Sequence, residues 1–310
     1  MEAPVAVLGF EAVFISYPVP SYSEGVVEGS SSTWSTRSRD YIVRVSTGVP
    51  ELDEALEGGV PKGSWVAITG EPGTGKSILC MHFAWAGLRE GDPVVYVTTE
   101  AEFRDVVRQA RQFGMDFESY TVYDISNPRE PQETPRIVVV DIFGLLKVAK
   151  QLSEEPGEEG RRYAVLDIQT LVAAIREAYR LLGVLKEGGK SPVKHVRLVI
   201  DSLSAFWADK PAMARRYSYE LKVATHRENV TAYLVSQYAM TTKSTFGFGL
   251  EHIADGVFHL WMDDVERAGE VVRYLIVKKM RMTNHYRRAF RVEIVPGHGL
   301  KLLPLERGTH

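Results

Sequence analysis

The segment GEPGTGKS, residues 70–77, decides the fold of this chain. It fits the pattern G-x-x-x-x-G-K-[ST], with Gly70, Gly75, Lys76 and Ser77 at the fixed positions. Glycines let backbone N–H groups turn inward around a phosphate without a clash at Cβ, and the lysine reaches the β- and γ-phosphates of a nucleotide. The segment therefore predicts a phosphate-binding loop.

The sequence on either side gives this loop a structural context. WVAIT (65–69) is an apolar strand, and SILCMHFAWAGLREG (77–91) is a helix that Gly91 closes. The positive end of such a helix points at the bound anion. A chance glycine turn is the alternative, and the order strand, loop, helix argues against it. The residues expected to contact the nucleotide are Gly70, Glu71, Pro72, Gly73, Thr74, Gly75, Lys76, Ser77 and Ile78.

Apolar strands alternate with helices along the rest of the chain. Further strands are expected at 93–100, 136–144, 196–202, 231–237, 256–263, 271–281 and 290–297, and further helices at 101–114, 166–185 and 213–227. This alternation indicates an α/β fold with a mostly parallel sheet. The last three strands follow one another without helices, so they are expected to extend one edge of the sheet in antiparallel fashion.

Residues 1–40 differ from the regular pattern that begins at Tyr41. GSSSTWSTRS (29–38) is typical of a linker, and the segment before it is compatible with one or two peripheral strands. We expect an N-terminal extension at 1–40 and one nucleotide-binding domain at 41–310. The extension is compatible with a linker, a subunit-docking arm or a misassigned start. Two charged inserts, at 153–162 and 186–192, are expected to be solvated loops.

Composition excludes several classes of protein. The 310 residues carry a net charge of −3, which argues against a strongly basic nucleic-acid binder. No apolar run approaches the roughly 18 residues of a membrane span, and the first residues lack a basic leader. Cys80 is the single cysteine, which excludes a disulfide framework within one chain. We expect a cytoplasmic protein without a membrane partner.

Two strands end in an acidic residue that is suited to a Mg²⁺ site beside the phosphates. Asp141 follows VVV, and Asp201 follows LVI and precedes Ser202. Both positions qualify, because ligands lie at the carboxyl ends of strands in such sheets. We favour Asp201, together with Ser77, as the pair of metal ligands. Asp141 is expected to cap a turn.

Two further strand-end residues are candidates for hydrolysis. Glu100 ends the second strand and is the best candidate to deprotonate water. Its alternative role is that of an acid at a helix N-terminus. Gln237 ends the fifth strand, where a neutral amide is suited either to sense the γ-phosphate or to satisfy the strand end.

Four segments resemble the KaiC-like ATPases, a branch of the RecA/RadA superfamily. They are STGVPELDEALEGGVPKGSWVAITGEPGTGKS (46–77), VYVTTEAEFRDVVRQARQFGMD (95–116), LVIDSLSAF (198–206) and VKKMRMTNHYRRAF (277–290). The resemblance covers roughly residues 41–303. Within the family, the chain is most similar in character to archaeal single-domain KaiC-like proteins and RadA paralogues. It implies a RecA-like P-loop NTPase core, ATP and Mg²⁺ at Gly70–Ser77, and Asp201 as the metal-binding acid.

The family resemblance also implies roles for residues outside the phosphate loop. Family members carry two adjacent glutamates after the second strand, and this chain has Glu100 followed by Ala101, so its hydrolysis rate is open. Members assemble as rings or filaments in which a neighbour supplies a Lys-x-Arg pair. Lys279 and Arg281 match that pair, whereas Met282 stands where the family has glycine. A solvated strand end is the alternative for this pair.

The resemblance leaves three functions to weigh. The first is an oligomeric ATPase of DNA recombination or repair, with single-stranded DNA and a recombinase as partners. Two features favour this DNA function: the loop at 238–249, with two phenylalanines and one lysine, and the basic cluster at 287–291. The segment at 9–12 has the wrong spacing for a RadA-type filament motif. The alternatives are a signalling ATPase with autokinase activity and a non-hydrolysing switched scaffold, which Ala101 favours.

Overall fold

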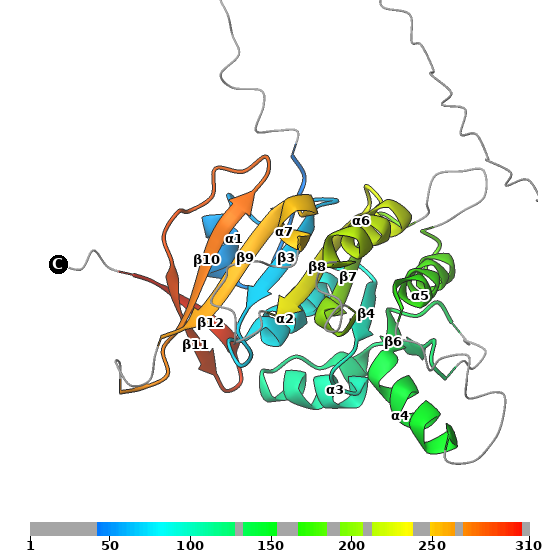
Figure 1. Cartoon of the computed structure of the whole chain (residues 1–310). Coiled ribbons are helices and arrows are strands. Elements are labelled where there is room, and N and C mark those ends of the chain that lie inside the picture. The colour runs from blue at the N-terminus through cyan, green and yellow to red at the C-terminus, as the bar shows by residue number, and fades with distance from the viewer. Residues whose placement is uncertain are drawn as a thin grey trace, which may run out of the picture. The chain divides into compact units, whose positions relative to one another are not determined.

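The computed structural model describes residues 42–127, 133–153, 167–184, 193–206, 213–237, 249–263 and 269–305 (Figure 1). The predictions for residues 1–40, for nearly all of the two charged inserts and for the loop at 238–248 lie outside these stretches. Among the described residues, no helix is long and apolar enough to cross a membrane.

Within these stretches, a ten-stranded sheet forms the centre of the domain, in the order β12-β11-β10-β9-β3-β8-β7-β4-β6-β5. Its strands are β3 (Trp65–Gly70), β4 (Val94–Thr98), β5 (Val122–Asp124), β6 (Ile137–Asp141), β7 (Val196–Asp201), β8 (Val230–Gln237), β9 (Gly256–Met262), β10 (Arg273–Met280), β11 (Phe290–Val295) and β12 (Gly299–Pro304). The strands from β9 through β3 to β5 pair in parallel, and β9 to β12 pair antiparallel. The predicted α/β fold with an antiparallel edge is confirmed (Figure 1).

Helices cover both faces of the sheet. The described helices are α1 (Pro50–Ala55), α2 (Lys76–Glu90), α3 (Phe103–Gln112), α4 (Ile142–Ser153), α5 (Ile168–Leu181), α6 (Ala214–Thr225) and α7 (Leu250–Ile253), with short 3₁₀ turns at Phe117–Ser119 and Leu203–Phe206. One apolar core joins α1, α2 and α3 to the sheet, and a second core joins α5, α6 and α7 to the opposite face. Both faces of the central strands are therefore buried, which explains their continuous apolar sequences.

The sequence prediction was wrong at several element boundaries. The strand predicted at 136–144 ends at Asp141, because the Asp141 carboxylate accepts the N–H of Gly144 at 2.7 Å and α4 begins there. The helix α4 was not predicted, because its first three residues were assigned to that strand. The short elements α1, β5 and β12, and the separate pair of β1 (Arg44–Val45) with β2 (Val60–Pro61), were not predicted either. Elements of two to six residues carry too little periodicity to be read from sequence.

The parallel register brings the carboxyl ends of four strands together. Gly70 at the end of β3 lies opposite Gln237 of β8, and Thr98 of β4 lies opposite Asp201 of β7. The neighbouring order β3-β8-β7-β4 then places the phosphate loop and the predicted acidic residues at one edge. Ligands bind at this edge in open α/β sheets.

Candidate nucleotide-binding and hydrolysis site

The phosphate loop joins β3 to α2 through glycines in the left-handed region. Gly73 has φ +77° and Gly75 has φ +104°, conformations that a side chain disfavours. Gly75 is the N-cap of α2, and no side chain caps this helix. The first N–H groups of a fifteen-residue helix therefore face the loop without a side-chain acceptor.

Lys76 is held inside the loop. Its Nζ donates to the carbonyl oxygen of Glu71 at 2.5 Å, and the Thr74 hydroxyl donates to the same oxygen at 2.8 Å. Burial lowers the pKa of Lys76 to about 8, although the charges of Asp201 and Glu100 raise it in part. The Lys76 residue is 5% exposed, and an anion stabilises the charge of a buried lysine, so the loop favours phosphate.

Asp201 at the end of β7 and Ser77 in the first turn of α2, the two predicted metal ligands, are in contact. The Ser77 side chain hydrogen-bonds Asp201, and burial raises the pKa of that carboxyl to about 6 against the influence of Ser77 and Lys76. A hydroxyl and one carboxylate fit Mg²⁺, which takes one or two protein ligands and completes its octahedron with phosphate oxygens and water. Among the described residues, no cluster of three or more His, Cys, Asp or Glu side chains suited to a metal occurs.

Glu100 lies two residues beyond β4 and is bound through both carboxylate oxygens. The Ser202 hydroxyl donates to Oε1 at 2.6 Å, and the Gln237 side-chain amide donates to Oε2 at 2.6 Å. The Gln237 backbone N–H is itself held by the Ser204 hydroxyl at 2.7 Å. The structure thus brings the two predicted hydrolysis residues into direct contact.

Asp141 plays the structural part that the sequence predicted. Its two oxygens accept the N–H groups of Phe103 at 2.9 Å and Gly144 at 2.7 Å, so one carboxylate caps the starts of α3 and α4. Asp141 ends β6, and β4 lies between β6 and β7, the strand that Asp201 ends. Burial raises the pKa of Asp141, and the two backbone donors oppose this.

Lys279 and Arg281 lie far from the phosphate loop of their own chain. The end of β10 pairs with Gly256 of β9, which pairs with Val66 at the start of β3. Four residues of extended chain, or about 13 Å, separate Val66 from Gly70. Lys279 donates to the carbonyl oxygens of Glu251 and Ala254, and Arg281 binds the Asp255 carboxylate at 3.0 Å.

Met282 follows this pair and adopts φ +58°, the left-handed conformation that favours glycine. The backbone therefore follows the path that a glycine would take, at a cost of about 1 kcal/mol in strain for the side chain. Its side chain is 63% exposed. In the nearby basic cluster at 287–291, Arg291 pairs with Glu270 at 3.5 Å, and Arg287 and Arg288 are exposed.

Sequence reasoning missed one cation at the phosphate loop. Arg273, the first residue of β10, donates from Nε to the carbonyl oxygen of Gly73 at 2.9 Å. The antiparallel pairing of β10 with β9 places the start of β10 at the carboxyl edge of the parallel strands. The predicted antiparallel edge already indicated this contact. It implied that the arginine at the start of the strand predicted at 271–281 lies near the phosphate loop.

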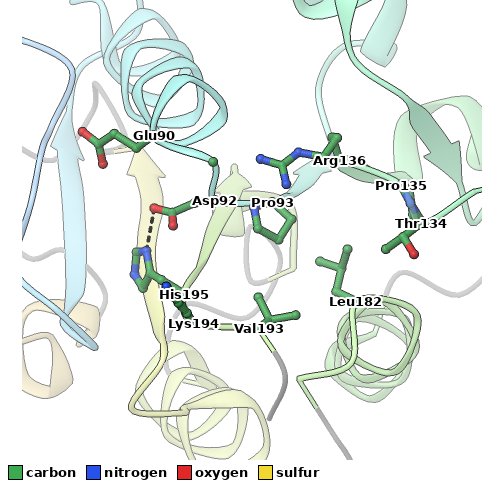
Figure 2. Close-up of a pocket in the computed structure, with 11 residues that line it drawn as sticks. Glu90, Asp92, Pro93, Thr134, Pro135, Arg136, Leu182, Val193, Lys194 and His195 are labelled. Atoms are coloured by element: carbon green, nitrogen blue, oxygen red, sulfur yellow. Dashed lines mark hydrogen bonds and ion pairs between the residues drawn. The ribbon is translucent and has the colours of Figure 1, made fainter.

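A cavity of about 360 Å³ lies at the opposite, amino-terminal edge of the sheet, where none of the predicted site residues is found (Figure 2). Its wall includes Asp92 and His195, whose side chains are 2.8 Å apart. Behind them Arg197, fully buried, binds Asp92 at 3.2 Å and also pairs with Glu90. This ionic cluster connects the end of α2 to β7. We therefore interpret the charged residues beside the cavity as structural.

The fold and the site together define a P-loop nucleotide-binding protein with a RecA-type core. Comparison with known proteins is consistent with this class: the profile of the KaiC ATPase family matches residues 45–307. A UPF0273 protein of Methanopyrus kandleri is 36% identical over 265 residues, covering 85% of this chain and 93% of that protein. A UPF0273 protein of Thermotoga maritima is 35% identical over 86% of this chain and 98% of its own length.

A solved structure gives the same result. The crystal structure of a KaiC-like protein from the archaeon Pyrococcus horikoshii has a TM-score of 0.59 and 29% identity, covering 85% of this chain and all of that chain. The chain therefore belongs to the KaiC-like ATPase family. The resemblance on which the sequence analysis relied is confirmed.

Proposed function

We propose that this protein binds ATP with Mg²⁺ and hydrolyses it. The observation that carries the proposal is the position of Glu100, which lies at the same sheet edge as Lys76 and is bridged by hydrogen bonds to Ser202 and Gln237. A carboxylate beside a phosphate loop is the group that hydrolysis needs to take a proton from water. Ala101 in place of a second glutamate leaves this single base.

In the proposed reaction, a water oxygen forms a bond to the γ-phosphorus, and the bond from that phosphorus to the β–γ bridging oxygen breaks. The electron pair of the broken bond stays on the bridging oxygen of ADP, and the proton of the water passes to Glu100. Lys76 neutralises charge on the β- and γ-phosphates. Ser77 and Asp201 are the residues that would hold Mg²⁺, which would supply further neutralisation of the phosphate charge.

We also propose that the protein acts as an oligomer, with Lys279 and Arg281 completing the site of a neighbour. The support is their distance from the phosphate loop of their own chain, at the opposite end of β3. Lys279 and Arg281 can then reach a γ-phosphate only at the site of a second copy. Such a cation stabilises the charge that spreads over the transferring phosphoryl group.

Handling of single-stranded DNA in recombination or repair stays a prediction, with a recombinase as its predicted partner. It rests on the loop at 238–249, of which the structure describes only the last residue, and on the exposed Arg287 and Arg288. Autokinase activity likewise has no support among the described residues.

The test is ATP turnover measured with and without single-stranded DNA at low salt, with oligomer mass determined on the same samples. We expect turnover in the wild type, loss of turnover with retained nucleotide binding in Glu100→Gln, and loss of both in Lys76→Ala. Glu100→Gln with wild-type turnover would remove the proposed base. DNA that neither binds nor changes turnover would count decisively against the DNA role.

A further inference from the structure

Ser202 is the more deeply buried of the two hydrogen-bond partners that the structure gives Glu100. It directly follows Asp201, is fully buried, and joins the end of β7 to the end of β4. Its backbone N–H donates to the Thr99 hydroxyl at 2.9 Å, and that hydroxyl donates to the Ser202 carbonyl oxygen at 2.9 Å. The Ser202 hydroxyl is left to reach the residue after Thr99, which is Glu100.

The two oxygens of Glu100 meet different environments. Oε1 accepts from the buried hydroxyl of Ser202, whereas Oε2 accepts from the amide of Gln237 in an exposed contact. A buried hydroxyl without a partner costs about 1–3 kcal/mol, so the bond to Oε1 persists. An exposed amide exchanges its partner for water at little cost, so the bond to Oε2 is the one that breaks readily.

We propose that Ser202 is a positioning residue for hydrolysis: it holds Glu100 by Oε1 and leaves Oε2, which Gln237 covers in the structure, as the oxygen that takes the proton from water. This inference rests on the proposed function, because it requires Glu100 to be the base. The inference also gives Gln237 a second role, in addition to the predicted sensing of the γ-phosphate. When its amide turns to the phosphate, the reacting oxygen of Glu100 becomes free.

A purely structural role for Ser202 predicts something different. A buried serine that only satisfies its own hydroxyl affects folding and the general shape of the site, and its loss acts whether or not Glu100 is present. A positioning residue acts through Glu100 alone. The two roles are separated by a double-mutant cycle in which the effect of one substitution is measured with and without the other.

The experiment measures kcat, KM, nucleotide affinity and melting temperature for S202A, E100Q and the double variant, with single-turnover rates where kcat is low. Ser236→Ala is the matched control, because Ser236 is also fully buried at a strand end of the same sheet and its Oγ lacks a hydrogen-bond partner. We expect S202A to lower kcat about ten- to a hundredfold, the range of a hydrogen bond to a charged group, with KM and nucleotide affinity unchanged. We expect S236A to match the wild type.

The decisive result is the effect of S202A in the E100Q background. No further loss of turnover there supports the positioning role. An equal loss in both backgrounds, or wild-type kcat in S202A alone, overturns it while leaving Glu100 as the base. Wild-type turnover in E100Q instead overturns the proposed function itself, so the two failures are distinguishable.

Discussion

Arg273 and Gly73 lie 200 positions apart in the chain, yet the Arg273 guanidinium donates to the Gly73 carbonyl oxygen at 2.9 Å. Gly73 is the middle of the phosphate loop, and Arg273 opens the strand next to β9. This hydrogen bond links the antiparallel edge of the sheet to the predicted phosphate loop.

We accordingly expect Arg273→Ala to weaken ATP binding about tenfold, because a charge-assisted hydrogen bond contributes about 1.5–3 kcal/mol and this one is exposed. Titration with a fluorescent nucleotide measures the affinity. Arg291→Ala is the control, since Arg291 belongs to the same edge of the sheet and forms an ion pair with Glu270 at 3.5 Å. Equal affinities in the two variants would show that Arg273 does not support the loop.

Replacement of Arg281 by Ala is expected to abolish turnover while nucleotide binding is retained, because Arg281 lies at the far end of β3 from its own phosphate loop. Mixing this variant with Lys76→Ala chains provides the sharper measurement. Each variant is inactive alone, but a mixed oligomer contains sites with an intact loop and an intact neighbouring arginine. We expect the mixture to regain part of the turnover.

The exposed Arg288 is the control for that experiment. Arg288→Ala removes a cation from the same connection between β10 and β11, but it leaves the contact of Arg281 with Asp255 in place. We expect its turnover to match the wild type. Unchanged turnover in Arg281→Ala would contradict the proposal that Arg281 completes the site of a neighbour. A mixture that stays inactive would place Arg281 in a role within its own chain.

His82 makes the stability of the fold dependent on pH. Its Nε2 accepts the N–H of Leu300 at 2.9 Å, so Nδ1 carries the hydrogen and donates to the Gly48 carbonyl oxygen at 3.1 Å. Burial lowers the pKa of His82 to about 4, with the Gly48 bond acting in the opposite direction. A proton on Nε2 would cost the bond to Leu300.

The sign of the effect follows from the unfolded chain, where the histidine pKa is about 6.5. The unfolded state binds more protons between these two values, so the free energy of unfolding falls as pH drops from about 6.5 to about 4. The loss amounts to about 3 kcal/mol. Urea titrations across this range should show a smaller loss in His82→Leu than in the wild type. The exposed His252, changed to Gln, is the control and should leave the wild-type slope.

Two glycines of the phosphate loop are expected to differ in their response to alanine. A Cβ at Gly70 would collide with the carbonyl oxygen of Leu260, whereas a Cβ at Gly73 meets nothing within 4 Å. Gly73→Ala should therefore cost only the strain of φ +77°, about 1–2 kcal/mol. Gly70→Ala should cost clearly more, because β3 and β9 must separate. Urea denaturation midpoints measure both, and equal losses would show that the strands move apart freely.

Much of the fold could be predicted because its buried strands are continuous apolar runs and its longer helices are periodic. The phosphate loop, Asp201 and Glu100 follow from residue type at the ends of those strands. The boundary at Asp141 could not be predicted, because that carboxylate caps two helices, and one of them begins 38 positions earlier in the chain. The short elements α1, β5 and β12 depend on packing partners that are distant in sequence.

The sequence by itself was enough to predict a nucleotide-phosphate site at 70–77, since glycine conformations and a neighbouring lysine are local properties. Only the tertiary structure decided how Glu100, the proposed base, is held. Ser202 and Gln237 reach Glu100 across 102 and 137 positions, through the parallel register of β4, β7 and β8. It also decided that Arg273 touches the loop and that Arg281 does not. Strand pairing sets which distant residues meet, and no local pattern encodes that pairing.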